Sequence, residues 1–155
     1  TATAEIGMRE VPDGSNDGPR VHVYTDGDKA PWCAYFCSWC IRQGFGRDKA
    51  FPPFRTRASV QKIRDWAREG GRLFVAADSK LSPVPLDVPT AEPRAGDLFL
   101  MLAVGGDGVD TGRGHVGFVA EVTPAEIATV EGNCGNAVRA RRRGRKTITT
   151  YARVV

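Results

Sequence analysis

The chain has 155 residues, which is enough for one ordinary domain with a hydrophobic core. Its hydrophobic fraction of 41% and charged fraction of 26% are those of a soluble globular protein, and no apolar run approaches the ~20 residues that cross a membrane. The formal net charge is +4, and much of the excess lies in Arg139–Lys146. Such a stretch suits an anionic partner such as a cell-wall polymer, a lipid headgroup or nucleic acid, but a solvated hairpin is the simpler interpretation.

The N-terminal third of the chain predicts short helices followed by one long buried helix. Ala2–Arg9 has an amphipathic helical pattern, and Val21–Tyr24 begins another short element after a turn-rich run. Residues 31–41 are apolar nearly all round, which predicts a buried helix. Pro31 is tolerated at a helix start, and Gly44 is placed to end the helix.

The remainder of the chain predicts one more helix and then strands. Ala58–Glu69 has apolar residues at helical spacing and is closed by Gly70-Gly71, whereas the proline-rich residues 78–96 predict an extended surface segment. The segments rich in strand-forming residues are Asp97–Val104, His115–Val122, Ile127–Glu131 and Thr147–Val155. Helices first and strands afterwards favour an α+β fold with an antiparallel sheet.

Four cysteines raise the choice between a disulfide, a metal site and a reactive thiol. Cys33, Cys37 and Cys40 follow i, i+4, i+7 spacing along one face of the predicted helix. Neighbours on one helix are badly aimed for pairing with each other, so we expect individual thiols. Zinc sites usually draw cysteines from short-spaced pairs on loops, so we predict no metal site from these residues with Cys134 and His115.

Cys33 is the cysteine whose position in the predicted helix most favours a reactive thiolate. A free thiol has a pKa of about 8.5, so most of it is inert at neutral pH. The start of a helix supplies unpaired N–H groups and a positive dipole end, both of which favour a thiolate. Cys33 occupies that position, whereas Cys37 and Cys40 lie one and two turns deeper, where apolar burial favours the neutral thiol. We therefore expect Cys33 to be a nucleophile.

A thiol nucleophile needs a base, and the sequence offers two histidines. His22 has no context that indicates a role, whereas His115 follows the Gly-rich residues 105–114 and opens a predicted strand. Alternation places His115 and Gly117 on the face opposite the core, where Gly117 would leave open space beside the imidazole. The core face of the same strand would carry Val116, Phe118, Ala120 and Val122.

A base also needs an orienting group, and the next strand ends in two candidates. Glu131 and Asn133 share a face, and pairing of antiparallel strands could bring either one to His115. A carboxylate or an amide that accepts from the ring N–H would fix the tautomer and support the imidazolium.

Five short motifs complete the pattern. They are Glu5-Ile6-Gly7 with Glu10, Pro31-Trp32-Cys33-Ala34-Tyr35-Phe36 with Ser38-Trp39, Pro93-Arg94-Ala95-Gly96-Asp97, Gly114-His115-Val116-Gly117-Phe118-Val119, and Glu131-Gly132-Asn133. In this order, and over nearly the whole chain, the set resembles the CHAP domains (cysteine- and histidine-dependent amidohydrolases/peptidases). These domains are relatives of NlpC/P60 within the papain-like clan.

The resemblance implies both a fold and a set of catalytic roles. The fold would be papain-like, of the NlpC/P60 type, with the nucleophile at a helix N-terminus packed on an antiparallel sheet that carries the histidine. Cys33 would attack an amide carbonyl while His115 shuttles the proton. Glu131 would orient the histidine, with Asn133 as a further polar member. The Cys33 backbone N–H would contribute to an oxyanion hole.

The implied substrates are amides of bacterial peptidoglycan, and no cofactor is implied. We place Trp32, Gly114 and Gly117 next to the substrate because they flank the nucleophile and the histidine in sequence. Asp26 and Asp28 resemble the calcium loop that some CHAP domains carry ahead of the cysteine. The remaining ligands of such a loop are not evident, so a solvated turn is the simpler interpretation.

We therefore expect a single catalytic domain over residues 1–155 that acts as an N-acetylmuramoyl-L-alanine amidase or a peptidoglycan endopeptidase. The chain begins at Thr1 and carries no export signal of its own, so we expect a processed or excised product that is secreted or delivered to the wall or periplasm. We expect a monomer without a nucleic-acid partner. Two alternatives stay open: a thiol protease or deamidase acting on a protein, and a binding module that uses Arg139–Lys146 without chemistry.

Overall fold

The computed structural model describes residues 1–45, 58–78, 88–104, 110–148 and 150–154. In these ranges the helices are η1 (Ala2–Glu5), α1 (Pro19–Thr25), α2 (Cys33–Phe45), α3 (Val60–Glu69) and η2 (Arg145–Thr147), of which η1 and η2 are 3-10 helices. The strands are β1 (Leu73–Phe74), β2 (Leu98–Val104), β3 (Asp110–Val122), β4 (Glu126–Glu131), β5 (Arg139–Gly144) and β6 (Thr150–Ala152). None of the helices described is both long enough and apolar enough to span a bilayer.

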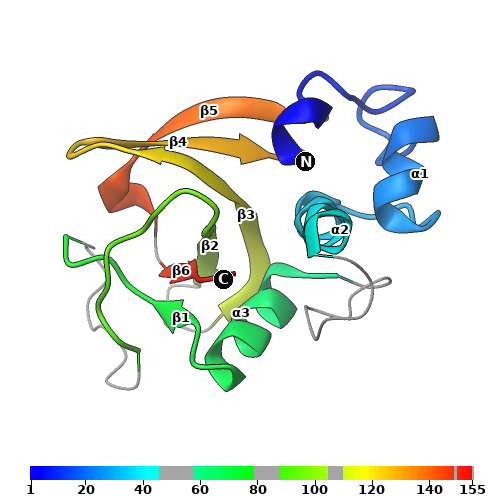
Figure 1. Cartoon of the computed structure of the whole chain (residues 1–155). Helices are drawn as coiled ribbons and strands as arrows, with labels where there is room; N and C mark the ends of the chain where they lie inside the picture. Colours follow the sequence, from blue (N-terminus) through cyan, green and yellow to red (C-terminus); the bar gives the residue numbers. More distant parts are fainter. Residues whose placement is uncertain (46–57, 79–87, 105–109, 149, 155) are drawn as a thin grey trace.

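The strands form one antiparallel sheet with the order β1-β6-β2-β3-β4-β5. The sheet is curved, and β3 bends through its centre (Figure 1). Helix α2 packs on β3 and β4, α3 packs on β1, β2 and β3, and α1 packs on α2 (Figure 1). The predicted α+β class with an antiparallel sheet is therefore confirmed.

Alternation along the strands separates two hydrophobic clusters. Leu98, Leu100 and Val116 belong to the cluster that also contains the buried residues of α2 and α3. Phe99 and Val119, which point the other way, belong to a second cluster formed by the opposite face of the sheet. The sheet is therefore buried on both faces near its centre, where β2 and β3 pair.

The predicted helices are present with adjusted ends. Helix α3 begins at Val60, and its N-cap Ser59 accepts a hydrogen bond from the Lys62 backbone N–H at 3.2 Å. Gly71 has a φ of +64°, which suits the end of a helix. In contrast, α2 runs through Gly44 to Phe45, so the expectation that Gly44 ends this helix is wrong.

Three strand expectations need correction. Residues 110–114, expected in a Gly-rich loop, are the first part of β3, while residues 105–109 lie outside the described residues. The basic stretch contains β5, the edge strand that pairs with β4. Ala120 is exposed rather than in the core, because the register of β3 against β4 shifts between Val119 and Glu121 and interrupts the alternation.

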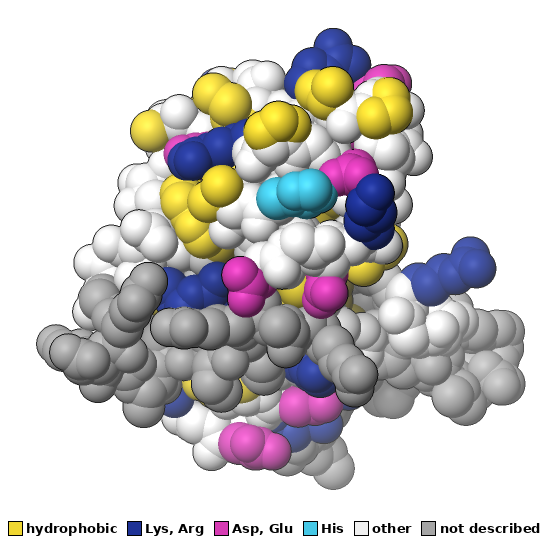
Figure 2. Space-filling model, turned by 90° about the vertical axis from the view of Figure 1, so that its right-hand side faces the viewer, with side chains coloured by type: hydrophobic (Ala, Val, Ile, Leu, Met, Phe, Trp, Pro, Cys, Tyr) yellow, Lys and Arg dark blue, Asp and Glu magenta, His cyan; other side chains and the backbone are white. Residues whose placement is uncertain are grey.

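Helix α1 lies on the side of α2 away from the sheet, whereas the N-terminal segment lies beside the end of the sheet, where the Gly7 N–H donates to the Val138 carbonyl oxygen; together they form one outer face. On this face hydrophobic side chains are scattered among charged ones (Figure 2). Exposed apolar residues of these elements include Ile6, Met8, Val11 and Val23. Of the expected surface segment 78–96, residues 79–87 lie outside the described residues, and in the described part Thr90 forms a bridge with Val75.

Candidate active site

His115 and Glu131 meet across neighbouring strands. The β3–β4 register pairs Phe118 with Val130, which brings the preceding part of β3 beside the end of β4. His115 Nε2 and Glu131 Oε2 are 2.8 Å apart. Of the two orienting groups that the sequence left open, the carboxylate is therefore the one that contacts the imidazole.

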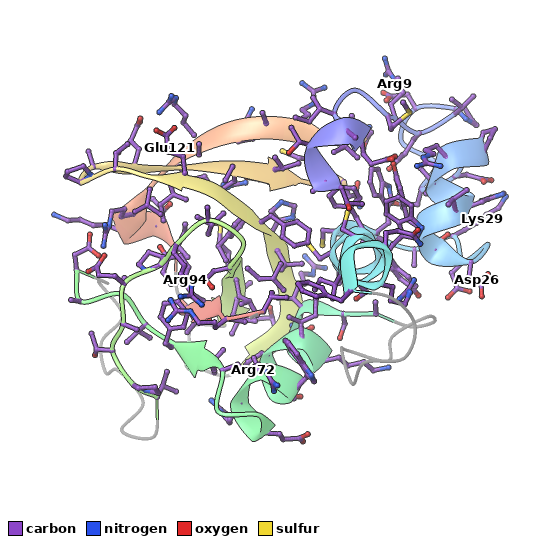
Figure 3. The ribbon with its side chains drawn as sticks, viewed as in Figure 1. Arg9, Asp26, Lys29, Arg72, Arg94 and Glu121 are labelled. Atoms are coloured by element: carbon purple, nitrogen blue, oxygen red, sulfur yellow. The ribbon has the colours of Figure 1, made fainter. Side chains whose placement is uncertain are left out.

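Cys33 approaches the same imidazole from the start of α2. The Cys33 thiol and the His115 side chain form a hydrogen bond. Because Nε2 already contacts Glu131, Nδ1 is the ring nitrogen left for the sulfur. Side chains from α2 and from the curved β3 fill the space between helix and sheet (Figure 3). The two residues are thus brought together from 82 positions apart in the sequence (115 − 33).

The sulfur is largely buried but opens onto a groove. Cys33 is 7% exposed. The groove is lined by Ala30, Pro31, Cys33, Ala34, Tyr35, Ala58, Ser59, Val60, Gln61, Gly112, Arg113 and Gly114. Gly114, expected beside the substrate, lies in this lining, and an added Cβ there would come within 2.6 Å of the Met101 carbonyl oxygen. Cys33 therefore lies in a groove that is bounded by the start of α3 and the first part of β3.

Glu131 is a fully buried carboxylate held by several donors. Its side chain is 0% exposed. Thr129 Oγ1 donates to Oε1 at 2.5 Å, and Arg143 donates through Nε to Oε1 and through Nη2 to Oε2, both at 2.6 Å. Burial alone would raise the pKa of Glu131, but the hydrogen bonds from Arg143, His115 and Thr129 outweigh it and hold the pKa well below its usual range. The carboxylate is therefore ionised at neutral pH.

This carboxylate and the thiol govern the protonation of His115. Burial lowers the pKa of His115, but the hydrogen bonds with Cys33 and Glu131 together outweigh it and raise the pKa from 6.5 to about 9. The imidazole is consequently protonated at neutral pH. An imidazolium beside a cysteine sulfur is the arrangement that favours a nucleophilic thiolate.

Gly117 has a different role from the one expected. It does not leave open space beside the imidazole, because that space is filled. An added Cβ would lie 2.7 Å from Phe99 Cε1, 2.9 Å from Glu131 Cγ and 2.9 Å from the Val130 carbonyl oxygen. Gly117 therefore makes room for the orienting carboxylate and lies beneath the site rather than in the groove.

Trp32 and Asn133 also lie beneath the groove. Trp32 is 0% exposed, and its Nε1 donates to Glu10 Oε1 at 2.8 Å, so its ring belongs to the core and not to a substrate-facing surface. Asn133 Nδ2 donates to the same Glu10 oxygen at 3.2 Å, and Asn133 Oδ1 accepts from the Trp32 backbone N–H at 3.0 Å. Asn133 thus ties the end of β4 to the residue that precedes α2, and its side chain makes these contacts rather than one with His115.

Cys134 is a second thiol near the site that the sequence did not single out. The ligand atoms of His115, Glu131 and Cys134 all lie within 4.8 Å of one another. Burial and the neighbouring carboxylate of Glu131 raise the pKa of the Cys134 thiol, which donates to that carboxylate. Both oxygens of Glu131 already accept from Arg143, so a metal ion bound here would have to displace a bidentate guanidinium. The donor set does not suit a cation.

The other predicted features are placed as follows. Burial is the main cause that raises the pKa of Cys37 well above its usual value and that of Cys40 to about 12, so both are neutral thiols. Asp28 accepts a hydrogen bond from the Tyr35 hydroxyl at 2.8 Å. Asp26 lies at the end of α1, on the far side of α2 from the sheet (Figure 3). These two carboxylates do not form a group of ligands among the residues described.

Two arginines of the basic stretch Arg139–Lys146 form ion pairs within the protein. Arg143 is engaged with Glu131, and Arg145 contacts Asp78 at 3.0 Å and Glu92 at 2.8 Å with only 10% of its side chain exposed. An anionic polymer would therefore meet the remaining basic side chains of the stretch, which are Arg139, Arg141, Arg142 and Lys146.

One of three comparisons with known proteins gives a match. Searches of the curated proteins and of the solved structures give no match to this chain. The family model described as "CHAP domain" matches residues 25–133, a span that begins just before α2 and ends just after β4. It contains Cys33, His115 and Glu131, and it covers more than half of the chain. The chain belongs to the CHAP domain family, which implies an amidase or peptidase hydrolase.

Proposed function

We propose that this chain hydrolyses amide bonds of bacterial peptidoglycan, with Cys33 as nucleophile, His115 as proton carrier and Glu131 as the group that orients His115. The observation that carries the proposal is the continuous contact from the Cys33 thiol through the His115 ring to a buried, ionised carboxylate. The same three-part logic underlies other thiol hydrolases, in which the nucleophile, the base and the orienter form one hydrogen-bonded chain. A papain-like fold of the NlpC/P60 type accords with a nucleophile that heads a helix beside a histidine-bearing strand.

The first half of the reaction releases the amine. The Cys33 thiolate attacks the carbonyl carbon, and the carbonyl electrons move to the oxygen, where the Cys33 backbone N–H would stabilise the negative charge. As the tetrahedral intermediate collapses, the His115 imidazolium donates its proton to the leaving nitrogen and the C–N bond breaks. The product amine leaves, and the acyl group stays on sulfur as a thioester.

The second half regenerates the enzyme. His115, now neutral, takes a proton from water as the water oxygen attacks the thioester carbonyl. The C–S bond breaks, a carboxylic acid leaves, and the Cys33 thiolate again faces the protonated His115. Throughout the cycle the Glu131 carboxylate stays ionised, accepts from the ring and prevents it from rotating away from the sulfur.

Incubation of the purified chain with peptidoglycan from several wall types, followed by mass spectrometry of the soluble muropeptides, tests the proposal. We expect new free amines that depend on Cys33 and are absent with Cys33→Ala. A new amino-terminal L-alanine identifies an amidase, whereas a new amine within the stem peptide or cross-bridge identifies an endopeptidase. Cys40→Ala is the matched control because it removes another thiol of the same helix, deeper in the core, and should keep the activity.

Two results would contradict the proposal. If folded wild-type protein releases no fragment from any wall type, peptidoglycan is not the substrate. Cys33-dependent cleavage or deamidation of a protein would then identify the thiol protease or deamidase activity instead. If Cys33→Ala still releases muropeptides, the reaction does not use the Cys33 thiol. A circular dichroism spectrum of each variant establishes that a loss of activity does not reflect unfolding.

A further inference from the structure

We propose that Arg143 is a positioning residue of the active site, which acts through Glu131 on His115 and not on the substrate. This inference rests on the proposed roles of Cys33 and His115. Arg143 lies on β5, outside the span of the CHAP match, in a stretch that the sequence explains most simply as a solvated hairpin and otherwise as a surface for an anionic partner.

The geometry of the contact is that of a bidentate ion pair. Arg143 Nε lies 2.6 Å from Glu131 Oε1, and Nη2 lies 2.6 Å from Oε2. Both carboxylate oxygens are thereby fixed in one plane with the guanidinium, which is a far narrower orientation than a single hydrogen bond allows. Oε2 is also the oxygen that contacts His115 Nε2. The guanidinium therefore sets the direction from which the carboxylate meets the ring.

The arginine itself is held in place by strand pairing and by an aromatic face. Arg143 pairs with Ile127 in the β4–β5 ladder, and its side chain reaches back along the face that Ile127, Thr129 and Glu131 share. The guanidinium carbon lies 5.4 Å from the centroid of the Phe99 ring, within cation–π range. Its side chain is 21% exposed, so water screens the pair only in part. These contacts leave little freedom for the guanidinium.

The charge balance explains why the site needs this cation. The titratable groups around the Glu131 carboxylate come from α2, β3, β5 and the turn after β4; they are Cys37, His115, Arg143 and Cys134, and Arg141 of β5 also acts on Cys134. Among the described residues, Arg143 is the permanently charged group that donates directly to the carboxylate. A fully buried carboxylate without a permanent cation tends to take up a proton. A neutral Glu131 would no longer stabilise the His115 imidazolium, and the partnership with the Cys33 thiolate would weaken.

Substitution of Arg143 should therefore change the pH dependence of the thiol as well as the rate. In Arg143→Ala, alkylation of Cys33 by iodoacetamide, localised by peptide mass spectrometry, should begin at higher pH than in the wild type. The alkaline limit of muropeptide release should move to lower pH because the imidazolium loses its proton sooner. Muropeptide release at neutral pH should fall by about 10-fold to 100-fold, which is the usual loss when a residue that holds another side chain of an active site in position is removed.

Chemical rescue distinguishes positioning from general stabilisation. Guanidinium chloride at millimolar, non-denaturing concentration should restore part of the activity of Arg143→Ala, whereas sodium chloride at equal ionic strength should not. Arg143→Lys should be intermediate, because an ammonium supplies the charge but not the planar pair of N–H groups. Arg142→Ala is the matched control. Arg142 is next to Arg143 on β5, its side chain is exposed, and its contact with Glu126 is loose, at 3.7 Å.

The outcomes separate this inference from the proposed function. Folded Arg143 variants with wild-type pH profiles for both alkylation and release would overturn the role of Arg143. If Arg143→Ala does not fold, the test uses Arg143→Lys instead. A pH dependence of Cys33 alkylation in that variant equal to that of the wild type would then overturn the inference. If the wild type releases nothing from peptidoglycan but the alkylation profile of Cys33 still depends on Arg143, the substrate assignment fails while the positioning role stands.

Discussion

Replacing Gly117 by alanine should damage the site through Glu131, without direct contact with Cys33 or His115. The new methyl carbon would lie 2.7 Å from Phe99 Cε1 and 2.9 Å from both Glu131 Cγ and the Val130 carbonyl oxygen. Carbon atoms pack at about 3.5–4.0 Å, so each contact is too short by roughly an ångström. The Val130 oxygen belongs to the backbone of the sheet and cannot retreat easily. The Phe99 and Glu131 side chains must therefore move.

The expected cost has a structural and a catalytic part. Forcing an extra methyl into a packed interior should lower the free energy of unfolding by about 1–3 kcal/mol. A displacement of Glu131 by about 1 Å should turn His115 away from the sulfur and lower activity by roughly 100-fold. Urea denaturation measures the first quantity, and muropeptide release together with alkylation of Cys33 measures the second.

Gly144→Ala provides the control for this prediction. An added Cβ there meets only Thr147 Cγ2, at 3.8 Å, and its φ of −62° is open to any residue. This variant should keep both stability and activity. If Gly117→Ala matched the wild type in both measurements, the close packing around the orienting carboxylate would not be needed for function, and the reasoning from these distances would be refuted.

Two further predictions concern buried polar groups. The pKa of His115 is raised to about 9 in the folded state from 6.5, so its stabilising contribution is complete below pH 6.5 and disappears as the pH rises through about 9. Relative to His115→Gln, the wild type should lose on the order of 3 kcal/mol of unfolding free energy across that window; parallel pH profiles of the two proteins would contradict this. Glu10→Gln should cost about 1–3 kcal/mol by urea denaturation, because both Glu10 oxygens accept hydrogen bonds, so the amide NH2 must face either the Asn16 backbone N–H or the N–H groups of Trp32 and Asn133. Equal stability of wild type and Glu10→Gln would show that this buried junction tolerates the change.

Local patterns along the chain were sufficient for the class of the fold and for the choice of Cys33 and His115 as the candidate pair. The apolar run after Pro31 predicted α2, and the position of Cys33 at its start distinguished that thiol from Cys37 and Cys40. His115 was chosen because the sequence predicts a strand that begins there, in a chain with only one other histidine, although β3 begins earlier, at Asp110. These features depend on residues close together in sequence, whose geometry follows from the helical and strand periods alone.

Side-chain partners that depend on sheet curvature and strand register were beyond the sequence. Residue spacing left Glu131 and Asn133 both open, and only the CHAP resemblance singled out Glu131; the contact itself depends on how β4 pairs with β3. The role of Gly117 depends on what fills the space above it. Arg143 was hidden because its neighbours in sequence are exposed arginines, although a buried carboxylate at Glu131 demands a cation from somewhere.

The sequence by itself determined an α+β chain with a thiol at a helix start and a histidine on a strand, because periodicity and end effects act over a few residues. Only the tertiary structure decided that β5, an edge strand of the sheet, supplies the arginine that holds the orienting carboxylate. It also decided that Trp32 lies in the core rather than in the groove. These outcomes depend on which side chains are brought together from distant parts of the chain, and that information is absent from any short segment.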